Sequence, residues 1–174
     1  AFARAAAANA ATGAQLDRVH ALLNGAETLE GLAIDTDLRW ALLHPLVASG
    51  RAGDEEIEAE RDRDDTAAGH RHARTLRALR PTAEAKAEAW HLVVEQDELP
   101  NADQNAVVAG FQHYSQRALL VPYVEKYFDA IGEIYRTRSA EMGQDLITGL
   151  YPYTATEQAT VDRTDAHLRQ EQPT

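Results

Sequence analysis

The stretch TAAGHRHARTLRALRP, residues 66 to 81, concentrates the side chains best suited to bind a metal or an anion. It holds two histidines and four arginines and contains no acid. Imidazole is a common zinc ligand, and the planar guanidinium group suits carboxylates. On a helix, however, His70 and His72 are two positions apart and point about 200° away from each other. We therefore expect no metal site in this stretch.

Motifs for metal binding or nucleophilic catalysis are also missing from the rest of the sequence. None of the histidines is followed by another four residues later, so the His-Glu-x-x-His zinc motif is absent. The chain has no cysteine, and Ser49, Ser115 and Ser139 fall at expected helix ends, where serine caps more often than it attacks. A small enzyme using His70 or His113 as a base is the weakest hypothesis, because neither has an evident partner group. We expect no catalytic residue and no bound cofactor in this chain.

The charges of the chain are strongly segregated. Its formal net charge is -11, which disfavours nucleic-acid binding because phosphate contacts require a basic surface. Residues 54–65 carry eight acids and two arginines, whereas residues 66–80 carry four arginines and no acid. If these segments are neighbouring antiparallel helices, the second neutralises the first. The more specific alternative is that this helix binds a peptide carboxylate through His70, Arg74 and Arg77, which form an i, i+4, i+7 stripe. These three are our candidate substrate-binding residues.

Apolar residues recur at helical spacing along nearly the whole chain, and no useful strand-like alternation is present. Short turns join the expected helices into pairs of roughly 25 to 38 residues. This pattern predicts an all-α fold of antiparallel helical hairpins in a curved, α-solenoid-like array of the HEAT or armadillo kind. A compact irregular bundle is the alternative. No apolar run reaches the roughly 18 residues of a membrane helix, so we expect no membrane partner.

Several residues indicate where the helices begin and end. Asp35 or Thr36 can cap the N-terminus of a helix that holds TDLRWALLHPLVASG. Gly25 is well placed to end the preceding helix. Asn101, with Gln104 three residues later, resembles a capping box.

The expected core and surface follow from the same periodicity. Trp40 and Trp90 lie on apolar stripes and are expected to pack in the core. Four acids of the segment DEEIEAE, namely Glu55, Glu56, Glu58 and Glu60, are expected to form a solvated face. A further helix begins at Pro122 and has the apolar stripe Val124, Tyr127, Phe128, Ile131, Ile134 and Tyr135.

Long segments of the chain resemble one known family. GLAIDTDLRWALLHPLVASG, DDTAAGHRHARTLRALRPTAEAKAEAW, LPNADQNAVVAGF and VPYVEKYFDAIGEIYRTRSAEMGQDLITGLYP occur in this order. Together they resemble the C-terminal helical domain of bacterial aminopeptidase N, of the actinobacterial type, from about Leu16 to His167. The sequence departs from the family pattern at His44, Pro45 and Asp65.

The resemblance implies that residues 1–174 are a single C-terminal helical domain, a fragment of a larger cytoplasmic zinc aminopeptidase. In that family a separate catalytic domain holds the zinc, and the helical domain covers the active-site chamber and limits or guides peptide access. Its partners would be the catalytic domain of the same polypeptide and peptide substrates. We expect the fragment to be inactive alone. The alternative hypothesis is a free-standing helical-repeat scaffold that binds a protein partner.

Overall fold

A computed structural model describes residues 2–96 and 98–169, and within these residues the regular structure is helical with no strand, which confirms the all-α prediction. The first half contains α1 (Phe2–Ala8), α2 (Gly13–Asn24), α3 (Thr36–Ala48), α4 (Asp54–Arg63) and α5 (Ala67–Leu79). The second half contains α6 (Ala83–Trp90), the π-helical turn η1 (His91–Glu95), α7 (Asn101–Phe111), the 3-10 turn η2 (Tyr114–Gln116), α8 (Arg117–Leu120), α9 (Tyr123–Thr137), α10 (Ala140–Leu150) and α11 (Gln158–Arg169).

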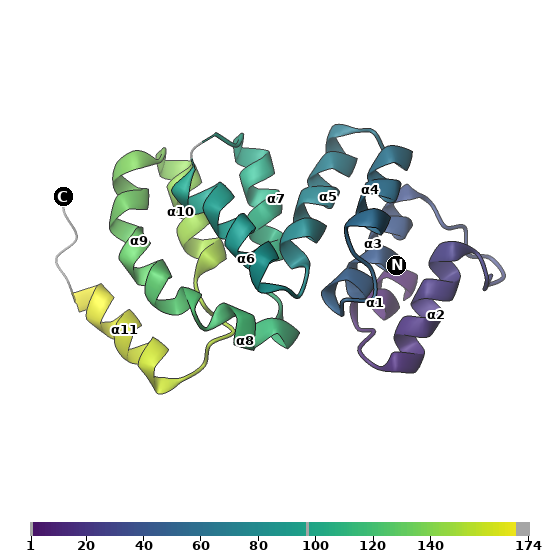
Figure 1. The fold of residues 1–174 in the computed structure, drawn as a ribbon, viewed down its shortest axis with the longest axis horizontal. Helices are drawn as coiled ribbons and strands as arrows, with labels where there is room; N and C mark the ends of the chain where they lie inside the picture. The colour runs from purple at the N-terminus through teal and green to yellow at the C-terminus, as the bar shows by residue number, and fades with distance from the viewer. Residues whose placement is uncertain (1, 97, 170–174) are drawn as a thin grey trace.

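The longer helices form two rows. In one row α1, α3, α5, α7 and α10 each contact the next helix. In the other row α2 and α4 pack on α3, α4 and α6 pack on α5, and α9 packs on α10. Figure 1 shows the second row in front of the first, with the chain running from α1 and α2 at one end to α9 and α11 at the other. The hairpins predicted from the sequence are therefore present, and the superhelical curvature of the array stays a prediction.

Two apolar clusters form the core, and α5 contributes to both. The first is centred on α3, whose apolar residues cover most of its circumference, as its sequence predicts. Trp40 is buried there, and Trp90 is buried in the second cluster among α6, α7 and α9. Both tryptophans thus have the core position that helical spacing predicts.

Helices α5 and α7 approach each other closely at Gly110. A Cβ atom at this position would lie 1.9 Å from the carbonyl oxygen of Thr75, so no larger residue fits without moving one of the helices. One turn earlier on α7, the carbonyl of Ala106 accepts a hydrogen bond of 2.8 Å from the Thr75 hydroxyl. This contact joins the two halves of the chain.

Buried side chains cover the C-terminal ends of the first-row helices, where backbone carbonyls lack helical partners. The donors are Gln116, Lys86 and Gln112, and all three are buried. Gln116 Nε2 donates to the carbonyls of Ala48 (3.0 Å) and Leu79 (2.8 Å), Lys86 Nζ to Ala78 (2.7 Å), and Gln112 Nε2 to Gly149 (3.0 Å) and Tyr151 (2.7 Å).

The structure corrects two local predictions. Asn101 is already the first residue of α7, and its amide donates to Glu141 of α10 instead of capping its own helix. Gln104 is buried and donates to the carbonyl of Met142, so the two residues form no capping box. On α9 the predicted apolar stripe packs inward except Tyr135, which is 63% exposed.

Candidate functional site

Helix α5 carries the candidate residues, and its start is built from the segment that precedes it. The hydroxyl of Thr66 accepts a hydrogen bond of 3.1 Å from the backbone N–H of Gly69 and so caps the helix. Asp64 accepts hydrogen bonds from the Thr66 hydroxyl and from Trp40 Nε1, and these two bonds lower the pKa of its carboxyl group. A Cβ atom at Gly69 would lie 2.0 Å from the carbonyl oxygen of Asp64. Glycine is therefore required where the chain folds back into α5.

The basic face of α5 is paired with the acidic helix α4. Ala73, Leu76 and Leu79 are buried, as the sequence predicts. Arg77 forms an ion pair with Glu58 of α4, and Arg80 forms one with Asp54 at the start of the same helix. The arginines of α5 therefore neutralise part of the negative charge of α4, as the sequence predicts.

The other two candidate residues also face carboxylates of the chain. His70 Nε2 lies 2.8 Å from Asp65 Oδ1, just before the helix. Arg74 Nη2 lies 3.4 Å from Asp103 Oδ2, in the first turn of α7. A substrate carboxylate would have to exchange with these internal partners.

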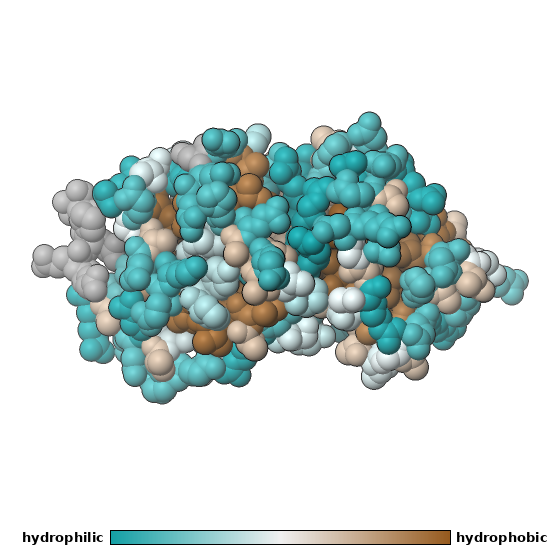
Figure 2. Space-filling model, viewed as in Figure 1, coloured by the Kyte–Doolittle hydropathy of each residue, from teal (hydrophilic) through white to brown (hydrophobic). Residues whose placement is uncertain are grey.

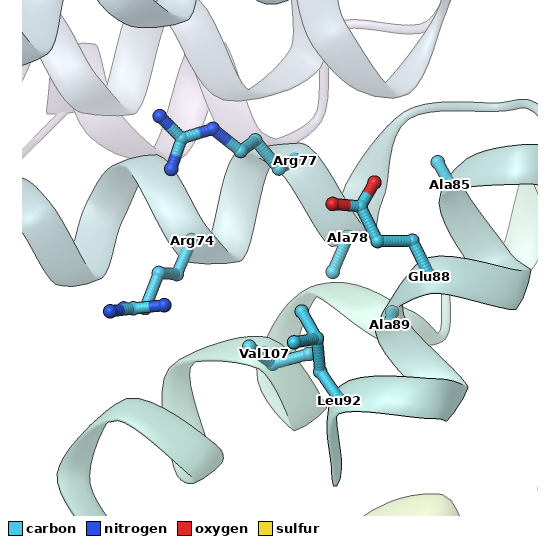
Figure 3. Close-up of a pocket in the computed structure, with 8 residues that line it drawn as sticks. All are labelled: Arg74, Arg77, Ala78, Ala85, Glu88, Ala89, Leu92 and Val107. Atoms are coloured by element: carbon cyan, nitrogen blue, oxygen red, sulfur yellow. The ribbon is translucent and has the colours of Figure 1, made fainter. Parts of the chain in front are cut away.

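The structure brings Arg74 and Arg77 together beside one small cavity of about 90 Å³, and His70 is not among its lining residues. Figure 3 shows that the two guanidinium groups point away from the cavity, while Glu88 of α6 points toward the position of Ala78. The arginine stems, together with Ala89 and Val107, form the walls. Binding sites for small molecules usually have volumes of about 300 to 1,000 Å³, so this cavity is too small to hold a peptide residue.

A larger groove lies on the opposite side of α5, where sequence reasoning selected no residue. It has a volume of about 440 Å³ and is formed by α1, α3 and α5. The ring of His72 stacks on that of Trp40 with 5.3 Å between centroids, and His44 lines the same groove. Burial lowers the pKa of His44, which favours its neutral form. Helical spacing places His72 about 200° from His70, on another face of the helix, but it does not indicate that a groove lies there.

The acidic helix α4 is not solvated as fully as its sequence predicts. Glu60 is only 4% exposed, and its two carboxylate oxygens accept hydrogen bonds of 2.7 Å from Nε and Nη2 of Arg39 on α3. The same guanidinium donates to the carbonyl of Leu23 at 3.2 Å. The expectation of a solvated Glu60 is wrong, because Arg39 supplies a bidentate partner that periodicity alone does not reveal.

Residues 2–96 and 98–169 contain no group of three or more histidine, aspartate or glutamate side chains that could hold a metal ion. Their helices are too short or too polar to cross a membrane.

Comparison of the sequence with those of known proteins places the chain in a family. A sequence model of the ERAP1-like C-terminal domain matches residues 1–174. Aminopeptidase N of Streptomyces lividans is 56% identical over 173 residues, which cover 99% of this chain and 20% of that protein. The chain thus spans about one fifth of the length of this relative. The resemblance read from the sequence is confirmed: the chain belongs to the family of ERAP1-like C-terminal domains.

Proposed function

We propose that this chain is the C-terminal accessory domain of a zinc-dependent aminopeptidase, an enzyme that removes N-terminal residues from peptides. The observation that carries the proposal is the 56% identity to aminopeptidase N over nearly the whole chain. In this proposal the parent enzyme is cytoplasmic, and its catalytic domain holds the zinc through a motif that this sequence lacks. The helical domain covers the active-site chamber and limits or guides the entry of peptides.

The proposal has a direct test of where catalysis takes place. The 174-residue chain and the full parent enzyme are assayed side by side on an aminoacyl p-nitroanilide, with zinc added to both. We expect turnover by the parent and none by the chain, because the chain supplies no His-Glu-x-x-His set to activate water. Turnover by the isolated chain at the rate of the parent would contradict the proposal.

The peptide-contacting residues are a finer part of the proposal. His70, Arg74 and Arg77 are the contacts predicted from the sequence, and guanidinium groups suit the carboxylate at the end of a peptide. The groove that His72 lines favours a second surface, because its volume of about 440 Å³ falls within the usual range for ligands. The two surfaces lie on different faces of α5 and can be tested separately.

Steady-state kinetics of the parent enzyme distinguish the two surfaces. If Arg74 and Arg77 bind the peptide, replacing both by alanine raises KM for a long peptide about tenfold, the effect of losing a charge-assisted hydrogen bond. If the groove binds it, His72→Ala has that effect instead. The p-nitroanilide carries a single residue and no peptide chain beyond it, so in this proposal its KM should be unaffected. Arg136→Ala is the matched control, since this arginine is exposed on α9 and forms an ion pair with Glu133 of the same helix. An unchanged KM for the long peptide in all variants would exclude peptide binding at both surfaces.

A further inference from the structure

A hollow of about 550 Å³ lies between α2 and α4, with α3 as its floor. Residues of all three helices line it, and its volume falls within the range of about 300 to 1,000 Å³ that is usual for small-molecule sites. In Figure 2, apolar surface is visible among hydrophilic side chains in the half of the molecule that holds α2 and α4. The basic stripe of α5 takes no part in this hollow.

The floor of the hollow is apolar because α3 carries apolar residues on most of its circumference. Leu43 and Leu46 of α3 line the hollow, and each is nearly completely buried. Leu23 of α2 and Ile34 of the following loop add apolar surface that is only partly covered by the protein. An aliphatic chain placed here would lose part of its contact with water.

The two carboxylates in the lining already have partners. Glu56 Oε2 accepts a hydrogen bond of 2.8 Å from the backbone N–H of Gly53 at the start of α4. Both oxygens of Glu60 accept hydrogen bonds of 2.7 Å from Arg39, which also lines the hollow. Both acids of the hollow thus accept hydrogen bonds from groups of the chain, and Glu60 is also paired with a cation.

The arginines of the lining outnumber its acids. Besides Arg39, the lining contains Arg51 and Arg63. Arg51 pairs with the exposed Asp17 of α2. The Arg63 side chain is 68% exposed, and its Nε lies 4.0 Å from Oε2 of Glu60. This oxygen already accepts a hydrogen bond from Arg39. The rim of an apolar hollow therefore carries a guanidinium group that is available to an anion, in a protein of net charge -11.

We propose that this hollow binds an aliphatic monocarboxylate, with the hydrocarbon chain against the partly exposed Leu23 and Ile34 and the carboxylate at Arg63. The hollow has a complement for each part of the ligand: Leu23 and Ile34 offer apolar surface that is only partly covered, and Arg63 on the rim offers a fork of N–H donors that fits a carboxylate. This site is independent of the proposed role in an aminopeptidase, since its lining belongs entirely to this chain.

Isothermal titration calorimetry of the 174-residue chain tests the proposal with hexanoate, octanoate and decanoate, each below its critical micelle concentration. We expect saturable binding of one ligand per chain, tightening on the order of tenfold for each two added methylenes. Octanol tests the head group at constant chain length and should bind more weakly than octanoate. Absence of saturable binding by decanoate, affinity independent of chain length, or equal affinity for octanol and octanoate would overturn the proposal.

Two variants locate the ligand in the hollow. Arg63→Gln should weaken octanoate binding about fivefold, as expected for an exposed charge pair, whereas the control Arg136→Gln on α9 should bind like the native chain. Ala59→Trp should abolish binding, because Ala59 lines the hollow on an exposed part of α4 and the indole would occupy its volume. Circular dichroism verifies that each variant is folded. Binding by Ala59→Trp as tight as by the native chain, or equal losses in the two arginine variants, would place the ligand elsewhere and refute the site.

Discussion

The buried amine of Lys86 should make the stability of the domain rise with pH through the mildly alkaline range. Its side chain is 0% exposed, and its Nζ donates to the carbonyls of Ala78 (2.7 Å) and Gly110 (3.5 Å), at the ends of α5 and α7. Burial lowers its pKa from 10.5 to about 8. The unfolded chain therefore binds this proton more tightly than the folded chain does.

The sign and size of the effect follow from this difference. Below about pH 8 the amine is charged in both states, and its burial costs the folded state about 3 kcal/mol relative to the neutral amine. Between about pH 8 and pH 10.5 the folded chain loses the proton first, so the free energy of unfolding rises with pH. From about pH 7 to about pH 9.5 the gain attributable to Lys86 is about 2 kcal/mol.

Urea unfolding of the native chain and of Lys86→Met at these two pH values isolates the contribution of this group. Methionine keeps most of the side-chain volume and removes the titrating amine, while all other ionisable groups are the same in both proteins. We expect the stability of the native chain relative to Lys86→Met to increase by about 2 kcal/mol from the lower to the higher pH. An NMR titration of the Lys86 side chain should give a midpoint near pH 8. Parallel pH dependence of the two proteins, or a midpoint near 10.5, would refute the reasoning.

Three further substitutions test contacts of the fold by chemical denaturation. Gly110→Ala should destabilise the chain by about 3 kcal/mol or more, because the added Cβ atom would collide with the Thr75 carbonyl. Gly132→Ala is the control, because a Cβ atom added there meets nothing within 4 Å. Glu60→Gln should cost about 3 kcal/mol by leaving Arg39 without its counter-ion, and a loss below about 1 kcal/mol would show that the pair is weak. Thr82→Ala should cost about 1 kcal/mol by removing the cap of α6, and Thr82→Ser should restore most of it if the hydroxyl is responsible.

Local signals predicted the helices and much of their packing. The side chain of Asp35 accepts a hydrogen bond from the N–H of Leu38 and so caps α3, and Gly25 ends α2 in a left-handed conformation, as their residue types indicate. The pairing of acidic α4 with basic α5 was predicted from their opposite charges, on the condition that these consecutive helices are antiparallel neighbours. These features depend on residue types at helix ends and on the charges of adjacent segments of the chain.

The errors arise where a distant residue determines the environment. In the sequence Glu60 belongs to an acidic stretch, which suggested a solvated side chain. In the structure it is buried because it forms a hydrogen-bonded ion pair with Arg39, 21 positions earlier. Gln104 has the spacing of a capping box, but its side-chain amide instead donates a hydrogen bond to the carbonyl of Met142, 38 residues later. For the candidate site, helical spacing correctly separated His70 from His72 but could not indicate which face of α5 meets a groove. That depends on how α1 and α3 pack beside it.

The buried donors at the ends of the first-row helices have a consequence for how the domain unfolds. In a repeat array whose units touch only through apolar faces, a terminal unit can detach while the others persist. Here the Gln116 side chain donates a hydrogen bond to the carbonyl of Ala48 at the end of α3, 68 residues earlier, and another to the carbonyl of Leu79 at the end of α5. Loss of the second half would leave carbonyls of the first half without partners. The hairpins are therefore not interchangeable modules, and the two halves should melt in a single transition.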